Sequence, residues 1–276
     1  MRSSIRPNQL GLFVSAGECR LGDGIRMGRY GLVIYGLSAY LATWVVTVYC
    51  VAFFGNITIQ HSVDGMPRSA VGWAISVNVL LLLMFGLQHS WMARKSFKNS
   101  LARYLPAAAE RSTYLFASCF ALGAVLVGWQ PVGLVVWDLP SSLGRTVVYV
   151  FYFLGWFVIA WTIWLIDHAD MFGLRQVWCY AKRQTYEPPG LVTPGPYRWC
   201  RHPMYVGWLL VFWATPIMTA GHFAVSVFFT LYILIAVRWE ERDLVETHGV
   251  AYRHYRSSVA MLFPIRKVWC KIRFWT

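Results

Sequence analysis

Long apolar runs without a charged residue alternate with shorter polar stretches along this chain. Four of these runs cover residues 31–55, 70–93, 112–136 and 146–166. Each is longer than the roughly 18 apolar residues that mark a helix able to cross a bilayer. The pattern therefore predicts four membrane-spanning helices. The third should end near Gln130 and Pro131, because proline lacks the amide hydrogen that a continuing helix needs.

A fifth apolar run, residues 204–236, is too long for one crossing. As a single helix it would extend about 50 Å, whereas the hydrocarbon core of a bilayer is about 30 Å thick. Pro216 and Gly221 lie near its middle and can interrupt a helix. We therefore predict a tight helical hairpin with arms of about 15 residues, since short arms are tolerated where they pack against protein. One long tilted helix is the alternative.

Composition agrees with a protein inside a membrane. The 276 residues are 57% hydrophobic and only 13% charged, against about 25% charged residues in soluble domains. Basic residues on membrane-flanking loops explain the net charge of +13, so no nucleic-acid partner is needed. The six cysteines form no CxxC pair, which supports neither a disulfide framework nor a zinc site.

The distribution of basic residues predicts the topology. Lysine and arginine concentrate in the N-terminal segment, between the second and third helices, after the fourth helix and in the C-terminal tail. Loops rich in these residues stay in the cytoplasm. With the hairpin counted as two crossings, every basic segment lies on the cytoplasmic side, and so do both termini.

Polar side chains gather at the predicted cytoplasmic helix ends, where such groups are costly and usually functional. They can share one pocket open to the cytosol: His89, Asp167, His168, His202, Glu240 and Glu241. Each also has a structural interpretation, because the histidines and Asp167 can cap helix ends and the glutamates can be solvated. The histidine spacing requires no metal, so none is expected.

The stretch 193–207 is harder to explain by structure alone. Pro194, Gly195 and Pro196 force a turn. Pro203 follows a few residues later, and a helix should begin there because proline is tolerated in a first turn. Aromatic and cationic side chains between these prolines suit a loop that grips an anion: Tyr197, Arg198, Arg201 and His202.

Two motifs resemble known families. Residues 201–207 read RHPMYVG, and Glu240 and Glu241 follow the apolar run. This pattern resembles the C-terminal signature of the isoprenylcysteine carboxyl methyltransferases and their bacterial relatives. Upstream, GLQHSWMAR at 86–94 and IDHADMFGLRQVW at 166–178 resemble the membrane-bound methanethiol S-methyltransferases, a bacterial branch related to the NnrU-like group. The second resemblance spans most of the chain.

The resemblance implies that S-adenosylmethionine binds on the cytoplasmic side. The residues that it places around this cofactor are Leu191, Val192, Tyr197, Arg201, His202, Pro203, Met204, Tyr205, Glu240, Glu241 and Tyr252. The cofactor carries an ammonium and a carboxylate, so it needs acidic and basic groups in one cleft. Glu240 can pair with the ammonium, while Arg201 or His202 can face the carboxylate.

The acceptor is expected to be a small thiol. The prenylcysteine enzymes place a substrate-binding arginine four residues before the cofactor glutamate, and this chain has Ala236 there. A small neutral acceptor is thereby favoured, most simply methanethiol, which gives dimethyl sulfide. A prenylcysteine or lipid acceptor is an alternative, and so is a ligand-binding membrane protein of the same fold without catalytic activity.

A histidine is the expected base, because a thiol titrates near 8.5 or above and arrives mostly protonated. His168 is favoured over His89, since Asp167 and Asp170 beside it can orient the ring. The third option is that no base is needed, because the charge of the sulfonium itself favours the thiolate.

The whole chain is therefore expected to be one membrane methyltransferase domain in a bacterial inner membrane. Its fold class is all-α integral membrane, with four long transmembrane helices, a C-terminal helical hairpin and a cytoplasmic cofactor-binding tail. Residues 1–29 form the cytoplasmic N-terminal segment, 30–168 the four helices, and 169–276 the cofactor-binding loop, hairpin and tail. Membrane lipid surrounds it, and no obligate protein partner is evident.

Overall fold

The computed structural model describes residues 28–57 and 61–263. Five helices in these ranges are long and apolar enough to cross a membrane. They are α1 (Arg29–Phe54), α2 (Val71–Met92), α4 (Glu110–Gly128), α5 (Ser142–Ile166) and α9 (Ala220–Ser258). The predicted helical membrane protein is confirmed at this level. Shorter helices lie between them: α3 (Lys95–Leu101), η1 (Ala107–Ala109), α6 (His168–Met171), α7 (Leu174–Lys182), η2 (Gly195–Arg198) and α8 (Pro203–Trp213).

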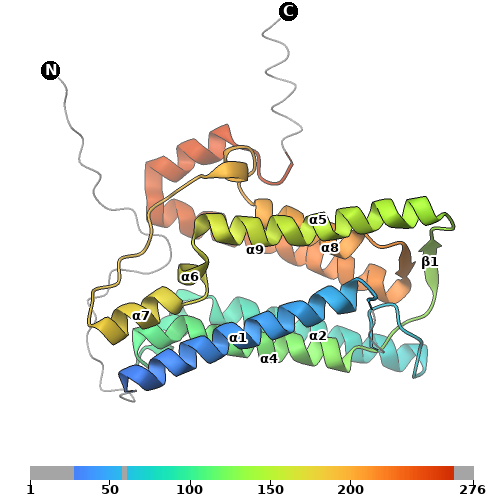
Figure 1. The fold of residues 1–276 in the computed structure, drawn as a ribbon, viewed down its shortest axis with the longest axis horizontal. Coiled ribbons are helices and arrows are strands. Elements are labelled where there is room, and N and C mark those ends of the chain that lie inside the picture. Colours follow the sequence, from blue (N-terminus) through green and yellow to red (C-terminus); the bar gives the residue numbers. More distant parts are fainter. Residues whose placement is uncertain (1–27, 58–60, 264–276) are drawn as a thin grey trace, which may run out of the picture.

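The long helices form two layers. One contains α1, α4 and α2, and the other contains α5, α8 and α9 (Figure 1). Aromatic side chains join the layers: the ring of Phe229 lies 5.8 Å from that of Phe85 on α2 and 4.8 Å from that of Phe212 on α8. Phe54 of α1 contacts Phe212 from the other side at 5.2 Å. Burial of these large side chains holds the layers together.

The last apolar run is a hairpin, as predicted. Its first arm, α8, has 11 residues and ends at Trp213, and the chain reverses before α9 begins at Ala220. The indole nitrogen of Trp213 donates to the Thr230 hydroxyl at 2.9 Å and ties the two arms. The second arm is longer than expected. It continues past the polar stretch 238–243, whose arginines and glutamates are good helix formers, to Ser258.

Two glycines fix how α8 sits on α5. A Cβ on Gly155 would lie 2.8 Å from the carbonyl oxygen of Gly207, and a Cβ on Gly207 would lie 2.8 Å from that of Gly155. Both values are too short for real atoms, so only two glycines allow the backbones to approach this closely. The contact fixes the position of α8, whose first turn carries the RHPMY motif.

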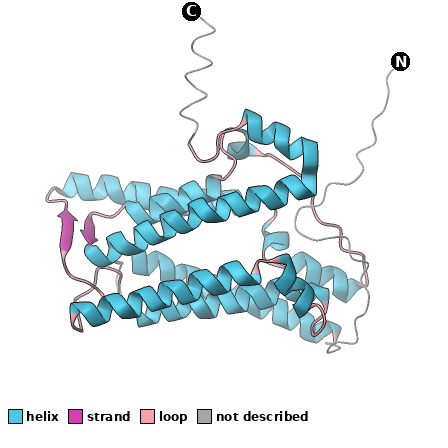
Figure 2. Cartoon of the chain, turned by 180° about the vertical axis from the view of Figure 1, so that it is seen from behind, coloured by secondary structure: helices cyan, strands magenta, loops and turns pink. Residues whose placement is uncertain are grey.

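Two short strands correct the all-helical expectation. β1 (Val135–Asp138) pairs antiparallel with β2 (Ile217–Thr219) at the end of the bundle where α8 turns into α9 (Figure 2). The third helix was expected to end near Gln130 and Pro131, and α4 ends at Gly128; what the pattern did not predict is a strand in the rest of this apolar run. Pro131 and Gly133 stop the helix, and the valines and tryptophan that follow favour a strand.

A buried ion pair closes the same end of the bundle. Asp64 accepts hydrogen bonds from the Thr219 hydroxyl at 2.7 Å, the Asn56 amide at 2.7 Å and His222 Nδ1 at 2.7 Å. The other ring nitrogen of His222 faces the Phe212 carbonyl oxygen at 3.1 Å. Both partners of the ring are hydrogen-bond acceptors, and an imidazole can donate to them from its ring nitrogens. Its side chain is fully buried and that of Asp64 is 4% exposed.

We expect Asp64→Asn to lower the free energy of unfolding by about 3–5 kcal/mol, because the buried His222 ring loses the anionic partner that lies 2.7 Å from its Nδ1. Burial alone would raise the pKa of Asp64, but hydrogen bonds from His222, Asn56 and Thr219 outweigh it and lower the pKa. This stabilisation is present above the unfolded-state pKa, so wild-type stability should fall as the pH drops below about 4. Unfolding in detergent micelles measures both effects.

The control is Asp138→Asn, which removes a half-exposed partner of Arg145. This change should cost about 1 kcal/mol or less. Equal losses in the two variants would show that the Asp64 pair carries no special stability.

Candidate active site

The RHPMY motif lies where the sequence predicted a turn and a helix start. The prolines form the single turn η2, and α8 begins at Pro203. Gly195 has φ +52°, and a Cβ there would lie 2.9 Å from the Leu165 side chain at the end of α5. The turn is therefore seated directly against α5.

A kink in α9 brings the end of the helix back over this motif. Gly249 has φ 55° and ψ −122°, which interrupts the helix at a conformation that glycine tolerates best. The chain after it folds back (red in Figure 1). The backbone N–H groups of Arg201 and His202 donate to the carbonyls of Ala260 at 2.8 Å and Met261 at 3.2 Å. The motif is thus bonded to the segment that follows α9.

Arg201 and Glu241 form a buried clamp at this junction. Arg201 Nε donates to Glu241 Oε1 at 2.7 Å, and its Nη1 donates to the carbonyls of Arg256 and Val259. His202 Nε2 lies 3.1 Å from the same carboxylate oxygen. The side chains of Arg201 and Glu241 are about one-tenth exposed. These contacts occupy the guanidinium that the sequence offered to the cofactor carboxylate.

We expect Arg201→Gln to destabilise the protein by about 3–5 kcal/mol, because Glu241 would be left buried without its main partner. The double variant Arg201→Gln with Glu241→Gln should recover part of the loss, since the unpaired charge is then removed as well. Arg198→Gln, at an exposed position of the same loop, should change stability by no more than about 0.5 kcal/mol. Strictly additive losses in the double variant would contradict the clamp.

Glu240 has a different environment from its neighbour. Its carboxylate accepts a hydrogen bond from the Tyr205 hydroxyl at 3.0 Å and lies 3.7 Å from His202 Nδ1. The side chain is 30% exposed, so it can still bind a ligand. Burial and the nearby Glu240 carboxylate raise the pKa of Tyr197, which stays neutral. Glu240 is therefore an anionic group bordered by tyrosines and one histidine.

His89 lies in a polar cluster between the two layers. Its Nε2 is 2.8 Å from the Tyr114 hydroxyl and its Nδ1 is 3.1 Å from the Ser118 hydroxyl. The ring of Tyr232 lies 6.4 Å from that of His89. Tyr205 is close enough to the hydroxyls of Tyr114 and Tyr232 for electrostatic interaction. The cluster thus connects His89 with the residue that holds Glu240.

His168 has a less favourable setting than expected. Its ring stacks on Trp164 with centroids 4.6 Å apart. Asp167 accepts from the Asp170 backbone N–H at 3.1 Å and pairs with Arg175. The Asp170 carboxylate is bonded to Tyr186 at 2.6 Å. In the described part of the chain both carboxylates bind other groups, and neither orients the His168 ring.

The remaining candidates are spread along the loop and the helices. Leu191 is half-buried and Val192 is 51% exposed, on the loop before η2. Met204 lies in the first turn of α8 and packs against the main core. Tyr252 lies beyond the kink in α9 and is 1% exposed. Sequence reasoning missed Tyr114 and Tyr232, because nothing in their local sequence distinguishes them from other tyrosines in apolar helices.

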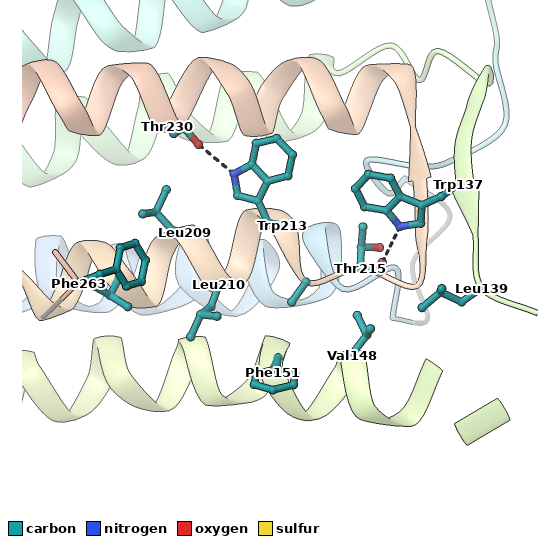
Figure 3. Close-up of a pocket in the computed structure, with 12 residues that line it drawn as sticks. Trp137, Leu139, Val148, Phe151, Leu209, Leu210, Trp213, Thr215, Thr230 and Phe263 are labelled. Carbon is teal, nitrogen blue, oxygen red and sulfur yellow. Dashed lines mark hydrogen bonds between the residues drawn. The ribbon is translucent and has the colours of Figure 1, made fainter. Parts of the chain in front are cut away.

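An apolar hollow of about 820 Å³ runs along α8 (Figure 3). One end lies at Trp137 and Thr215 beside the strand pair, and Val206, the neighbour of Tyr205, also lines it. Figure 3 shows Leu209 and Trp213 on the side of α8 that faces α9, and Leu210 on the opposite side, towards Val148 and Phe151 of α5. Its lining suits a hydrocarbon chain better than a charged ligand.

Comparison with known proteins decides the family. The chain is 42% identical to the methanethiol S-methyltransferase of Crocosphaera subtropica over 86% of this chain and 93% of that protein. It is 39% identical to the enzyme of the same name from Mycobacterium tuberculosis over 86% of this chain and 98% of that protein. This chain belongs to the methanethiol S-methyltransferase family.

More distant similarities extend beyond the methanethiol S-methyltransferase family. Nurim of Bos taurus is 30% identical over 66% of this chain and 77% of that protein. A family model described as phospholipid methyltransferase matches residues 146–250. That range contains most of α5, the RHPMY motif, the glutamate pair and the kink at Gly249. No solved structure matches the chain.

Proposed function

We propose that this protein transfers the methyl group of S-adenosylmethionine to methanethiol and produces dimethyl sulfide. The observation that carries the proposal is the partly exposed Glu240 carboxylate, set between Tyr205 and His202 in a chain whose relatives are named methanethiol S-methyltransferases. When bound, S-adenosylmethionine supplies a methyl group on a positively charged sulfonium.

The residues around Glu240 fit this donor. Its carboxylate can pair with the ammonium group, and the faces of Tyr205 and Tyr197 suit a neighbouring cation. The Tyr252 hydroxyl is buried and has no hydrogen-bond partner in the described part of the chain, so a ligand can supply one. Arg201 and Glu241 stabilise the structure around the site and do not bind the donor, because their side chains are paired with each other.

His89 is the better candidate for the base. The thiol sulfur forms the new bond to carbon while its proton passes to the Tyr114 hydroxyl, which gives its own proton to His89 Nε2 at 2.8 Å. The bond that held the methyl group breaks with its electrons on the leaving sulfur. Tyr114 and Ser118 hold the ring by hydrogen bonds. The apolar helices around the cluster exclude water. Aligning the sulfur and the methyl group can lower the barrier by about 7–11 kcal/mol.

A direct assay tests the proposed function. Purified protein in micelles is incubated with S-adenosylmethionine and methanethiol, and dimethyl sulfide is measured by headspace gas chromatography. Formation above that of an empty-membrane control supports the proposal. Absence of product from a folded protein that binds the donor would reject methanethiol as the acceptor.

A lipid acceptor is the second candidate. The hollow along α8 is large enough for an acyl chain, and the matching family model is described as phospholipid methyltransferase. The same incubation with methyl-labelled donor and phospholipid vesicles distinguishes the two. Label in the organic lipid extract would favour the lipid acceptor, and label only in the headspace would favour the thiol.

The basic segments support a site on the cytoplasmic side. The start of α8, where Tyr205 is hydrogen-bonded to Glu240, and the end of α2 both lie away from the strand pair (Figure 1). We expect a reporter active only in the cytoplasm to work when fused at Thr276, and a periplasm-specific reporter to work near His222. Activity of the periplasmic reporter at Thr276 would contradict this orientation.

A further inference from the structure

Two buried polar side chains near the kink of α9 have no hydrogen-bond partner. His248 is 4% exposed and Tyr252 is 1% exposed. Neither imidazole nitrogen nor the Tyr252 hydroxyl has a partner among the described residues. Buried polar groups are nearly always hydrogen-bonded, because leaving one unpaired is unfavourable. Two such groups four residues apart, on either side of Gly249, are better explained by a ligand than by packing.

The backbone places both residues inside the fold-back of α9. His248 lies seven residues after Glu241, which is two helical turns along the same face. That face is buried at Glu241, Leu244 and His248. The chain then reverses at Gly249. Tyr252 returns close enough to Glu241 and Glu240 for electrostatic interaction. His248 and Tyr252 thus lie on either side of Gly249, at the corner where α9 bends.

This corner differs chemically from the surroundings of Glu240. Leu244 precedes it, and its own polar groups are an imidazole and a phenol. Such groups can donate and accept hydrogen bonds without carrying a charge. A neutral polar ligand with hydroxyl groups and ring nitrogens matches them, whereas an amino-acid end needs the charged Glu240.

We infer that His248 and Tyr252 bind the nucleoside part of the methyl donor by hydrogen bonds. The inference rests on the proposed function and adds a division of roles within the donor site. Glu240 binds the amino-acid end, and the corner behind Gly249 binds the ribose or the adenine. The sequence had offered Tyr252 only as a residue lining the cofactor slot, and it gave no role to His248.

The test compares two ligands that share a nucleoside. S-adenosylhomocysteine has both the nucleoside and the amino-acid end, and 5′-methylthioadenosine lacks the amino-acid end. Binding of each is measured by calorimetry in micelles for the wild type, His248→Phe, Tyr252→Phe and Glu240→Gln. His254→Phe is the matched control, because His254 is exposed on the same helix beyond the kink.

His248→Phe and Tyr252→Phe should each weaken both ligands by about tenfold or more, as expected for a lost hydrogen bond. Glu240→Gln should weaken S-adenosylhomocysteine alone, and His254→Phe should change neither. Without ligand, the melting temperature of His248→Phe should equal or exceed that of the wild type, since an unpaired buried group is removed. Tyr252→Phe differs from the wild type by one oxygen atom, so it provides the test if His248→Phe fails to fold.

Two results would overturn the inference. One is unchanged affinity of folded variants for both ligands while the wild type binds. The other is a loss restricted to S-adenosylhomocysteine, which would assign His248 to the amino-acid end. A wild type that binds neither ligand would instead reject the proposed function.

Discussion

Glu240→Gln is expected to weaken S-adenosylmethionine binding by about 30-fold or more, because the donor ammonium loses a charged partner in a partly desolvated site. The substitution keeps the shape of the side chain and its bond from Tyr205, which is 3.0 Å long in the wild type. The loss should therefore appear in affinity and not in folding. Calorimetry with the donor, paired with thermal unfolding, separates the two effects.

Glu246→Gln is the matched control for this prediction. Glu246 lies on the same helix, is mostly exposed and pairs with Lys95 at the surface. Removing its charge should leave donor affinity within about twofold, since exposed pairs contribute little. Equal effects at the two positions would show that donor affinity depends on the overall negative charge of the helix. They would refute a specific role for Glu240.

His89→Ala is expected to lower turnover by about 10²- to 10⁴-fold, the usual effect of losing a general base. Donor affinity should be retained, because the site around Glu240 is left intact. The defect should shrink as the pH rises towards the pKa of the thiol, since more thiolate then arrives without help. Turnover of methanethiol measured across a pH series gives the profile.

His168→Ala provides the comparison. Its ring stacks on Trp164, so its loss should affect stability more than the pH profile. If His168→Ala shows the pH-dependent defect and His89→Ala does not, the roles are reversed. If both single variants and the double variant keep the wild-type profile, no histidine acts as the base.

Much of the fold follows from local patterns in the sequence. The charge-free runs predicted the long helices, because membrane crossing depends on the length and hydropathy of a continuous segment. Pro203 located the start of α8 and Pro216 the break before α9, since proline acts on its own backbone. The end of α9 was not predicted, because charged residues after an apolar run are compatible both with a loop and with a continuing helix.

The site was predictable in its residue types and less so in its pairings. The resemblance supplied Glu240, His202 and Tyr205, which the structure brings together. It did not indicate that Arg201 would pair with Glu241, because this contact depends on how the start of α8 packs on α9, and its bonds to the Arg256 and Val259 carbonyls depend on the fold-back at Gly249. A positive φ at one glycine has no clear local signal, yet it determines which groups meet.

The division of the site between distant elements has an evolutionary consequence. The groups proposed to hold the donor lie after residue 190, whereas His89, Tyr114 and Ser118 come from α2 and α4. The phospholipid methyltransferase match covers 146–250 and omits these two helices. A lineage can therefore change the molecule that receives the methyl group by substitutions in α2 and α4 while it inherits the donor site unaltered.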